Sequence, residues 1–157
     1  MYLIDTNVIS EARKGRNADP GVRAFWAETA ANDRAIFLAA PTVGELRRGV
    51  ELIRHRGDRA QAALLEAWLQ QVLEAYGDRV LALDSDAAQV WGRLQVPHPH
   101  QAIDKQIAAI ALLHDLTLVT RNSADVAGTG VRVLNPFSEP SSRPPRTSPQ
   151  DQSIHID

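Results

Sequence analysis

Cysteine is absent from this sequence, and its absence excludes several classes of protein. Disulfide-stabilised scaffolds, thiol enzymes and zinc sites built on thiolates all depend on cysteine side chains. An excess of basic charge is also lacking, because 17 Lys and Arg residues stand against 19 Asp and Glu residues and give a formal net charge of -2. The chain therefore has no overall basic field of the kind that attracts nucleic acids.

Long apolar runs are missing as well. No run approaches the roughly 20 residues that a membrane-spanning helix needs. The N-terminus has no basic residues ahead of an apolar stretch, as a secretory signal would have. We therefore expect a cytoplasmic protein that does not associate with membranes. Its 157 residues, of which 44% are hydrophobic, suit a single domain with a proper core.

The sequence does contain short apolar runs separated by helical patterns. The expected strands span 3–4, 36–40, 80–83, 116–120 and 131–134. Helical patterns follow Pro20 and Pro41 and cover 59–76, 85–94 and 104–114. Because the strands are wholly apolar rather than alternating, and helices separate most of them, the pattern predicts an α/β fold. We expect a three-layer sandwich with a mainly parallel central sheet of about five strands.

The composition changes after Phe137. Residues 138–157 hold four of the nine prolines, several serines and only two apolar aliphatic residues. Such a segment buries too little surface to offset the entropy of ordering it. We therefore predict one domain over 1–137 and a disordered tail over 138–157, with a late strand or partner-binding segment at 153–156 as the alternative.

Acidic residues fall where the strands of such a sheet should end. Asp5 ends the first strand, Glu45 lies in the first turns of the helix after the second, Asp104 begins the helix before the fourth, and Asp125 follows the fourth. Ligands of open parallel sheets bind outside the carboxyl ends of the strands. Crowded carboxylates repel one another, and a hard divalent cation such as Mg²⁺ removes that conflict. The pattern indicates a metal site.

Each acid also has an ordinary structural interpretation. Asp5 and Asp104 could cap helices, Glu45 could be a solvated helix residue, and Asp125 could belong to a turn. Taken singly, Asp5 and Glu45 favour these interpretations, but the joint arrangement favours the metal site. The pair His98 and His100 lies between prolines, which indicates a surface loop rather than a metal site.

Other features have two interpretations. The tryptophans at helical spacing suit the core or a dimer interface before a base-stacking role, and they are Trp26, Trp68 and Trp91. The basic cluster between Arg47 and Arg59 is typical of a solvated face, and it could also contact phosphates.

Four segments, in this order and spacing, resemble the PIN-domain ribonucleases. They are LIDTNVIS at 3–10, ELRRG at 45–49, IDKQIAA at 103–109 and LVTRNSAD at 118–125. Within that family they are most similar to the toxins of bacterial VapBC toxin–antitoxin modules, including the FitB-like branch, which residues 128–131 and 135–137 also resemble. The resemblance covers residues 1 to about 137.

The resemblance implies roles for particular residues. The family's acidic metal ligands correspond to Asp5, Glu45, Asp104 and Asp125, and some members carry the fourth acid where this chain has Asn122. The family's supporting polar and basic positions correspond to Thr6, Asn7, Arg48, Thr120 and Asn122.

The resemblance also implies an activity and partners. The activity is that of an Mg²⁺-dependent endoribonuclease, with Mn²⁺ able to substitute, in which a metal-activated water attacks an RNA phosphodiester. The implied role is the toxin of a type II toxin–antitoxin system. The partners are then the RNA substrate, a cognate antitoxin, a second copy in a homodimer, and operator DNA only through the antitoxin.

Two rival classes stay open at this stage. A haloacid-dehalogenase-like phosphatase also begins with an Asp at the end of its first strand, but it needs a second Asp two positions on, where Asn7 stands. A non-catalytic partner-binding module could use the acids as a structural cation site or an acidic face. A nucleotide-binding Rossmann domain is disfavoured, because no G-x-G-x-x-G follows the first strand.

Overall fold

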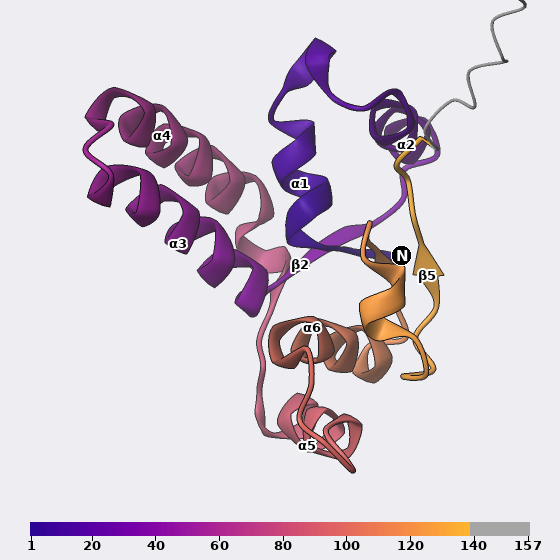
Figure 1. Ribbon diagram of the computed structural model, residues 1–157. Coiled ribbons are helices and arrows are strands. Elements are labelled where there is room, and N and C mark those ends of the chain that lie inside the picture. Colours follow the sequence, from indigo (N-terminus) through magenta and orange to yellow (C-terminus); the bar gives the residue numbers. More distant parts are fainter. Residues whose placement is uncertain (139–157) are drawn as a thin grey trace, which may run out of the picture.

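A parallel sheet lies at the centre of the computed structural model, which describes residues 1–138 (Figure 1). Its strands are β1 (Tyr2–Ile4), β2 (Ile36–Ala39), β3 (Val80–Leu81), β4 (Thr117–Val119) and β5 (Val133–Leu134). Their order across the sheet is β3-β2-β1-β4-β5, and every neighbouring pair is parallel. The predicted α/β fold is confirmed.

Six α-helices connect the strands within the described residues. They are α1 (Thr6–Ala12), α2 (Pro20–Ala31), α3 (Ala40–His55), α4 (Arg59–Tyr76), α5 (Ser85–Leu94) and α6 (Ala102–Leu113). Short 3₁₀ turns lie at η1 (Gly15–Asn17), η2 (Gly77–Arg79) and η3 (Ser123–Val126). Aspartates at 19, 58 and 84 accept backbone hydrogen bonds at the starts of α2, α4 and α5, which explains why these helices begin where they do.

Helices cover both faces of the sheet and form three layers (Figure 1). α1 to α4 contribute to the core on one face, and α5 and α6 contribute to the core on the other. Successive side chains of a strand point to opposite faces. In β1, Ile4 belongs to the first core and Leu3 to the second, and Val119 and Leu118 of β4 divide in the same way. Burial on both faces is therefore why the strands are wholly apolar.

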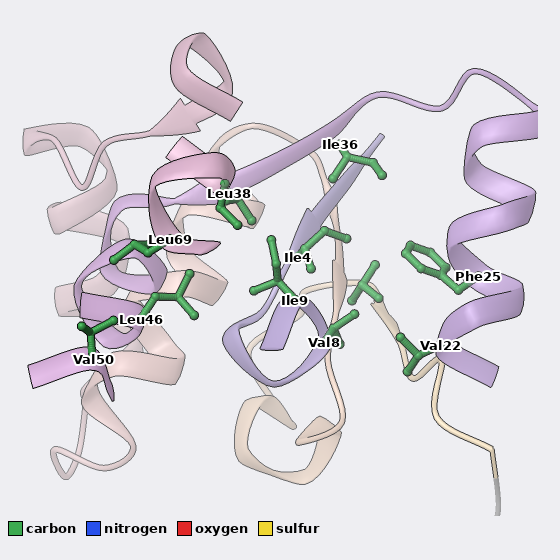
Figure 2. Packing of buried hydrophobic residues seen from close by; sticks show 12 residues of the cluster. Ile4, Val8, Ile9, Val22, Phe25, Ile36, Leu38, Leu46, Val50 and Leu69 are labelled. Atoms are coloured by element: carbon green, nitrogen blue, oxygen red, sulfur yellow. The ribbon is translucent and has the colours of Figure 1, made fainter. Parts of the chain in front are cut away.

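Figure 2 shows the first core, in which Ile4 of the sheet packs among residues from several helices. Val8 comes from α1, Phe25 from α2, Leu46 from α3 and Leu69 from α4. One cluster thus fixes α1 and α3, the helices that follow β1 and β2, against the sheet. These two helices carry polar residues to its carboxyl edge.

The tryptophans lie within or against the packed elements. Trp26 and Trp68 are partly buried against the first core, as the core interpretation predicted. The indole of Trp91 donates to the backbone oxygen of Ala102 at 3.2 Å and so connects α5 to the start of α6.

Two arginines of the basic cluster on α3 form ion pairs. Arg47 pairs with Glu51 and Glu66, and Arg54 pairs with the same two acids. All four side chains are exposed, so the solvated-face interpretation describes these two arginines.

Every strand differs from its predicted length by one or two residues, and the difference in β3 has a physical reason. β3 was expected over 80–83, but its ladder contains only Val80 and Leu81, which pair with Leu38 and Ala39. β2 ends at Ala39 because α3 begins at the next residue, so nothing remains for residues 82 and 83 to pair with. β5 likewise covers only the last two residues of the expected 131–134.

The predicted tail lies outside the described residues except for Ser138, which hydrogen-bonds to Asp19. Within residues 1–138, no helix combines the length and the apolar character needed to span a membrane.

Candidate active site

β1 leads directly into Asp5, which is only 5% exposed. Its Oδ1 accepts a hydrogen bond from the backbone N–H of Thr6 at 2.7 Å and caps α1. Its Oδ2 accepts from the Thr120 hydroxyl at 2.6 Å and from the Asn7 side-chain amide at 3.3 Å. Asp5 is therefore the helix cap that the ordinary interpretation expected, and it is also a carboxylate fixed at the carboxyl edge of the sheet.

Thr120 and Asn7 complete this network. Thr120 follows β4, the neighbour of β1, and is 1% exposed. Its hydroxyl donates to Asp5 and accepts from the Asn7 amide at 3.4 Å and from the backbone N–H of Asn122 at 3.0 Å. Asn7 in turn accepts from the backbone N–H of Arg121 at 3.1 Å. These bonds hold the ends of β1 and β4 together and orient Asp5.

Glu45 reaches the same edge from α3. Its Oε1 accepts a hydrogen bond from the Thr6 hydroxyl at 2.7 Å. Thr6 therefore serves both acids, because its backbone N–H binds Asp5 while its hydroxyl binds Glu45. α1 and α3 are placed by the first core, so the packing of the domain fixes this contact.

Asp104 lies in the first turn of α6 and is partly buried. Its pKa is raised from the ordinary 3.8 to about 6, first by burial and then by the charges of Asp5, Asp125 and Glu45, in that order of size. Three carboxylates from three other segments thus lie close enough to oppose the ionisation of Asp104. These three carboxylates are the other acids that the sequence singled out.

Asp125 belongs to η3 and is partly exposed. Its Oδ1 accepts a hydrogen bond from the side-chain amide of Gln101 at 3.3 Å. Asn122 lies at the start of η3, is exposed, and contributes its backbone N–H to the site through Thr120. The charge of Asp125 contributes to the raised pKa of Asp104, whereas Asn122 carries no charge.

The remaining predicted residue, Arg48, lies apart from the hydrogen-bond network. It is exposed on α3, one turn after Glu45, and it forms no ion pair with any described residue.

The donor set is suited to a hard cation. All four acids offer carboxylate oxygens, the ligands that Mg²⁺ prefers. In the described part of the chain, no three acidic or histidine side chains already stand at the spacing of a formed metal site. The mutual repulsion that raises the pKa of Asp104 is nevertheless the conflict that a divalent cation relieves. His98 and His100 are exposed in the loop between α5 and α6, as predicted.

Sequence reasoning missed Gln101. This residue precedes α6 with φ of 49°, in the left-handed region that non-glycine residues rarely adopt, and its side chain binds Asp125. It therefore joins the loop before Asp104 to the turn that carries Asp125. No local signal marks a glutamine for this role, because the contact spans 24 positions of sequence.

Comparisons with known proteins identify the family of the chain. The model of the PIN domain family matches residues 2–125. Toxin FitB of Neisseria gonorrhoeae is 31% identical over 144 residues, which cover 88% of this chain and 100% of that protein. The VapC ribonuclease Y4jK of Sinorhizobium fredii is 32% identical over 142 residues, covering 87% of this chain and 98% of the relative.

A solved structure of FitAB bound to an IR36 DNA fragment superposes with a TM-score of 0.75 at 28% identity, covering 91% of this chain and 100% of the matched chain. The family match extends from β1 through Asp125, the last of the four acids. By sequence, fold and the arrangement of its acidic residues, the chain belongs to the PIN-domain family.

Proposed function

We propose that this protein is the toxin of a bacterial type II toxin–antitoxin module and acts as an Mg²⁺-dependent endoribonuclease, with Mn²⁺ able to substitute. The observation that carries the proposal is that Thr6 hydrogen-bonds both Asp5 and Glu45 at the carboxyl edge of the sheet. The proposal is supported by Asp104, whose pKa is raised first by burial and then by the charges of Asp5, Asp125 and Glu45. It is supported by membership of the PIN-domain family and by the similarity to a FitB toxin and a VapC ribonuclease.

Different residues of the chain have different roles in such a reaction. Asp5, Glu45, Asp104 and Asp125 would hold the cation, whose chemistry is to activate a water and stabilise the leaving oxygen. Thr120 and Asn7 hold the Asp5 carboxylate in one orientation, and the Thr6 hydroxyl does the same for Glu45. None of these groups needs to become a covalent nucleophile, so water is the attacking group.

The structure weakens the case for a phosphatase of the haloacid-dehalogenase kind. Asn7 stands where that chemistry needs a second Asp, and its amide is engaged with Thr120 and the Arg121 backbone. An amide neither gains nor loses a proton near neutral pH, so Asn7 cannot act as the general acid or base of that chemistry. The observation favours metal-dependent phosphodiester hydrolysis over a phospho-enzyme route.

A cognate antitoxin is the proposed protein partner. A groove of about 320 Å³ opens beside Thr6 and Glu45, and its lining includes Leu46, Leu65 and Trp68. An apolar antitoxin segment in this groove would lie next to Glu45 and cover the side of the site that this carboxylate forms. Homodimerisation, operator binding only through the antitoxin, and a cytoplasmic location belong to the same proposal. Co-purification with the product of a short neighbouring reading frame tests the partnership.

RNA digestion with and without Mg²⁺ tests the activity. We expect wild-type protein to cleave RNA in Mg²⁺ and to stop when EDTA is added. Asp5→Asn should fold normally and lose at least about 100-fold in rate, because an amide is a poor metal ligand. The matched control is Asp115→Asn, which alters an exposed carboxylate just before the amino end of β4, away from the carboxyl edge. This variant should cleave RNA at the wild-type rate. Cleavage by Asp5→Asn at the wild-type rate, or wild-type cleavage that resists EDTA, contradicts the proposal.

A further inference from the structure

Arg121 is an exposed cation fixed at the edge of the carboxylate site. Its backbone N–H donates to Asn7, whose amide donates to Asp5, so the Arg121 backbone is two hydrogen bonds from that carboxylate. Its guanidinium lies over the ring of Phe137, 4.4 Å from the ring centroid. A guanidinium stacked on an aromatic face keeps its N–H edge available for other partners.

Phe137 is itself held in place by the end of the described chain. After β5 the backbone runs to α2 (Figure 1), where Ser138 donates from its N–H at 2.9 Å and from its hydroxyl at 2.6 Å to Asp19. A side chain at Gly21 could not be accommodated, because its Cβ would lie 2.2 Å from the backbone oxygen of Pro136. The segment that carries the Phe137 ring is thus closely seated on α2.

No carboxylate of the described residues neutralises the charge of Arg121. Within residues 1–138 it forms no ion pair, whereas Arg47, Arg54 and Arg132 each pair with at least one carboxylate. An oriented, unpaired guanidinium beside an acidic site is suited to an anion that must approach that site. Its planar N–H edge matches the oxygens of a phosphate.

The position of Arg121 in the sheet indicates which anion it meets. Glu45 enters the site from the β2 side, Asp5 follows the central β1, and Arg121 lies beyond β4 against the segment that follows β5. A strand of RNA that crosses the carboxyl edge of the sheet would place one phosphate among the acids and a neighbouring phosphate toward β5.

We propose that Arg121 is a substrate-binding residue that binds an RNA phosphate next to the one being cleaved, and that Phe137 positions the Arg121 guanidinium. The inference rests on the proposed nuclease function and adds the residue that holds the strand. Arg121 compensates locally for the repulsion between RNA and the four carboxylates, which a chain of net charge -2 does not offset overall.

Steady-state cleavage of a short fluorogenic single-stranded oligoribonucleotide in Mg²⁺, at several salt concentrations, tests the proposal. For Arg121→Gln we expect KM to rise, with the larger change in KM rather than kcat. The slope of log kcat/KM against log salt should become shallower by about 0.7, the value for one phosphate contact on a single strand. Arg132→Gln is the matched control, because it removes an exposed arginine just before the amino end of β5, away from the carboxyl edge. It should change neither KM nor the salt slope.

A second variant separates binding from stability. Phe137→Leu keeps the charge of Arg121 and removes its stacking surface, so KM should rise while the salt slope stays as in wild type. Wild-type KM and salt slope in Arg121→Gln, or wild-type KM in Phe137→Leu, would overturn the proposal. A lowered melting temperature of Arg121→Gln with unchanged KM would also overturn it, because Arg121 would then only fasten the end of the chain. Absence of cleavage by the wild-type protein would instead refute the nuclease function itself.

Discussion

Replacement of Asp104 by asparagine should make the metal-free protein more stable at neutral pH. The pKa of Asp104 is about 6 in the folded protein and 3.8 ordinarily, through burial and then through the charges of Asp5, Asp125 and Glu45. The folded state therefore holds the proton more tightly than the unfolded state does. Ionisation of Asp104 therefore lowers the free energy of unfolding as the pH rises from about 4 to 6, and the full loss is present above that range.

The size of the effect follows from the pKa and from the exposure of the carboxylate. One pKa unit corresponds to a difference of about 1.4 kcal/mol in free energy between the two protonation states. Asp104 is only partly buried, so water screens its repulsion by the other acids and reduces the cost to about 1 kcal/mol. The neutral amide avoids this cost. We expect the free energy of unfolding of Asp104→Asn to exceed that of the wild type by about 1 kcal/mol at pH 7.5, which corresponds to a Tm higher by about 3 °C.

Urea unfolding in EDTA, followed by tryptophan fluorescence at pH 4 and pH 7.5, measures this difference. The gain should be present at pH 7.5 and much smaller at pH 4, where Asp104 is protonated in the folded state and about half protonated in the unfolded state. Asp86→Asn is the matched control, because Asp86 is an exposed aspartate in the first turn of α5 and its replacement should bring no gain. Equal stability of wild type and Asp104→Asn at both pH values would refute the reasoning. Added Mg²⁺ should reverse the order, since the wild type then gains more binding energy than the variant.

Two further substitutions test the supports of the site. Thr120→Val removes the hydroxyl shared by Asp5, Asn7 and the Asn122 backbone. The free energy of unfolding should therefore fall by about 2 kcal/mol, and RNA cleavage should slow. An unchanged urea midpoint would show that these hydrogen bonds contribute nothing to stability. Gly21→Ala places a methyl group against the backbone at Pro136. It should lower the free energy of unfolding by about 1 kcal/mol after the helix preference of alanine is allowed for. A variant as stable as wild type in the same assay would argue against that close approach.

The architecture could be predicted because its determinants are local. The helix expected over 59–76 matches α4, since Asp58 caps its start and Gly77 follows its last residue. The wholly apolar strands predicted a sheet covered on both faces, and the two cores confirm it. The lengths of β3 and β5 could not be predicted, because they depend on where the neighbouring strand stops rather than on their own residues.

The site divides in the same way between local and distant determinants. Asp5 and Thr120 could be predicted, because each follows a buried strand whose carboxyl end must lie at one edge of a parallel sheet. The Thr6–Glu45 and Gln101–Asp125 contacts could not, because they join residues 39 and 24 positions apart through the packing of helices. The stacking of Arg121 on Phe137 likewise depends on how the chain after β5 meets α2.

Anomalous diffraction from crystals of the wild-type protein grown in manganese tests the metal site most directly. If the four acids converge in order to bind a divalent cation, a strong anomalous peak should lie between the carboxylates of Asp5 and Asp104, with Glu45 or Asp125 within reach of it. Crystals of Asp104→Asn grown in the same way should show a weaker peak or none. Density for ordered carboxylates with no anomalous peak between them in the wild-type crystals would contradict the account.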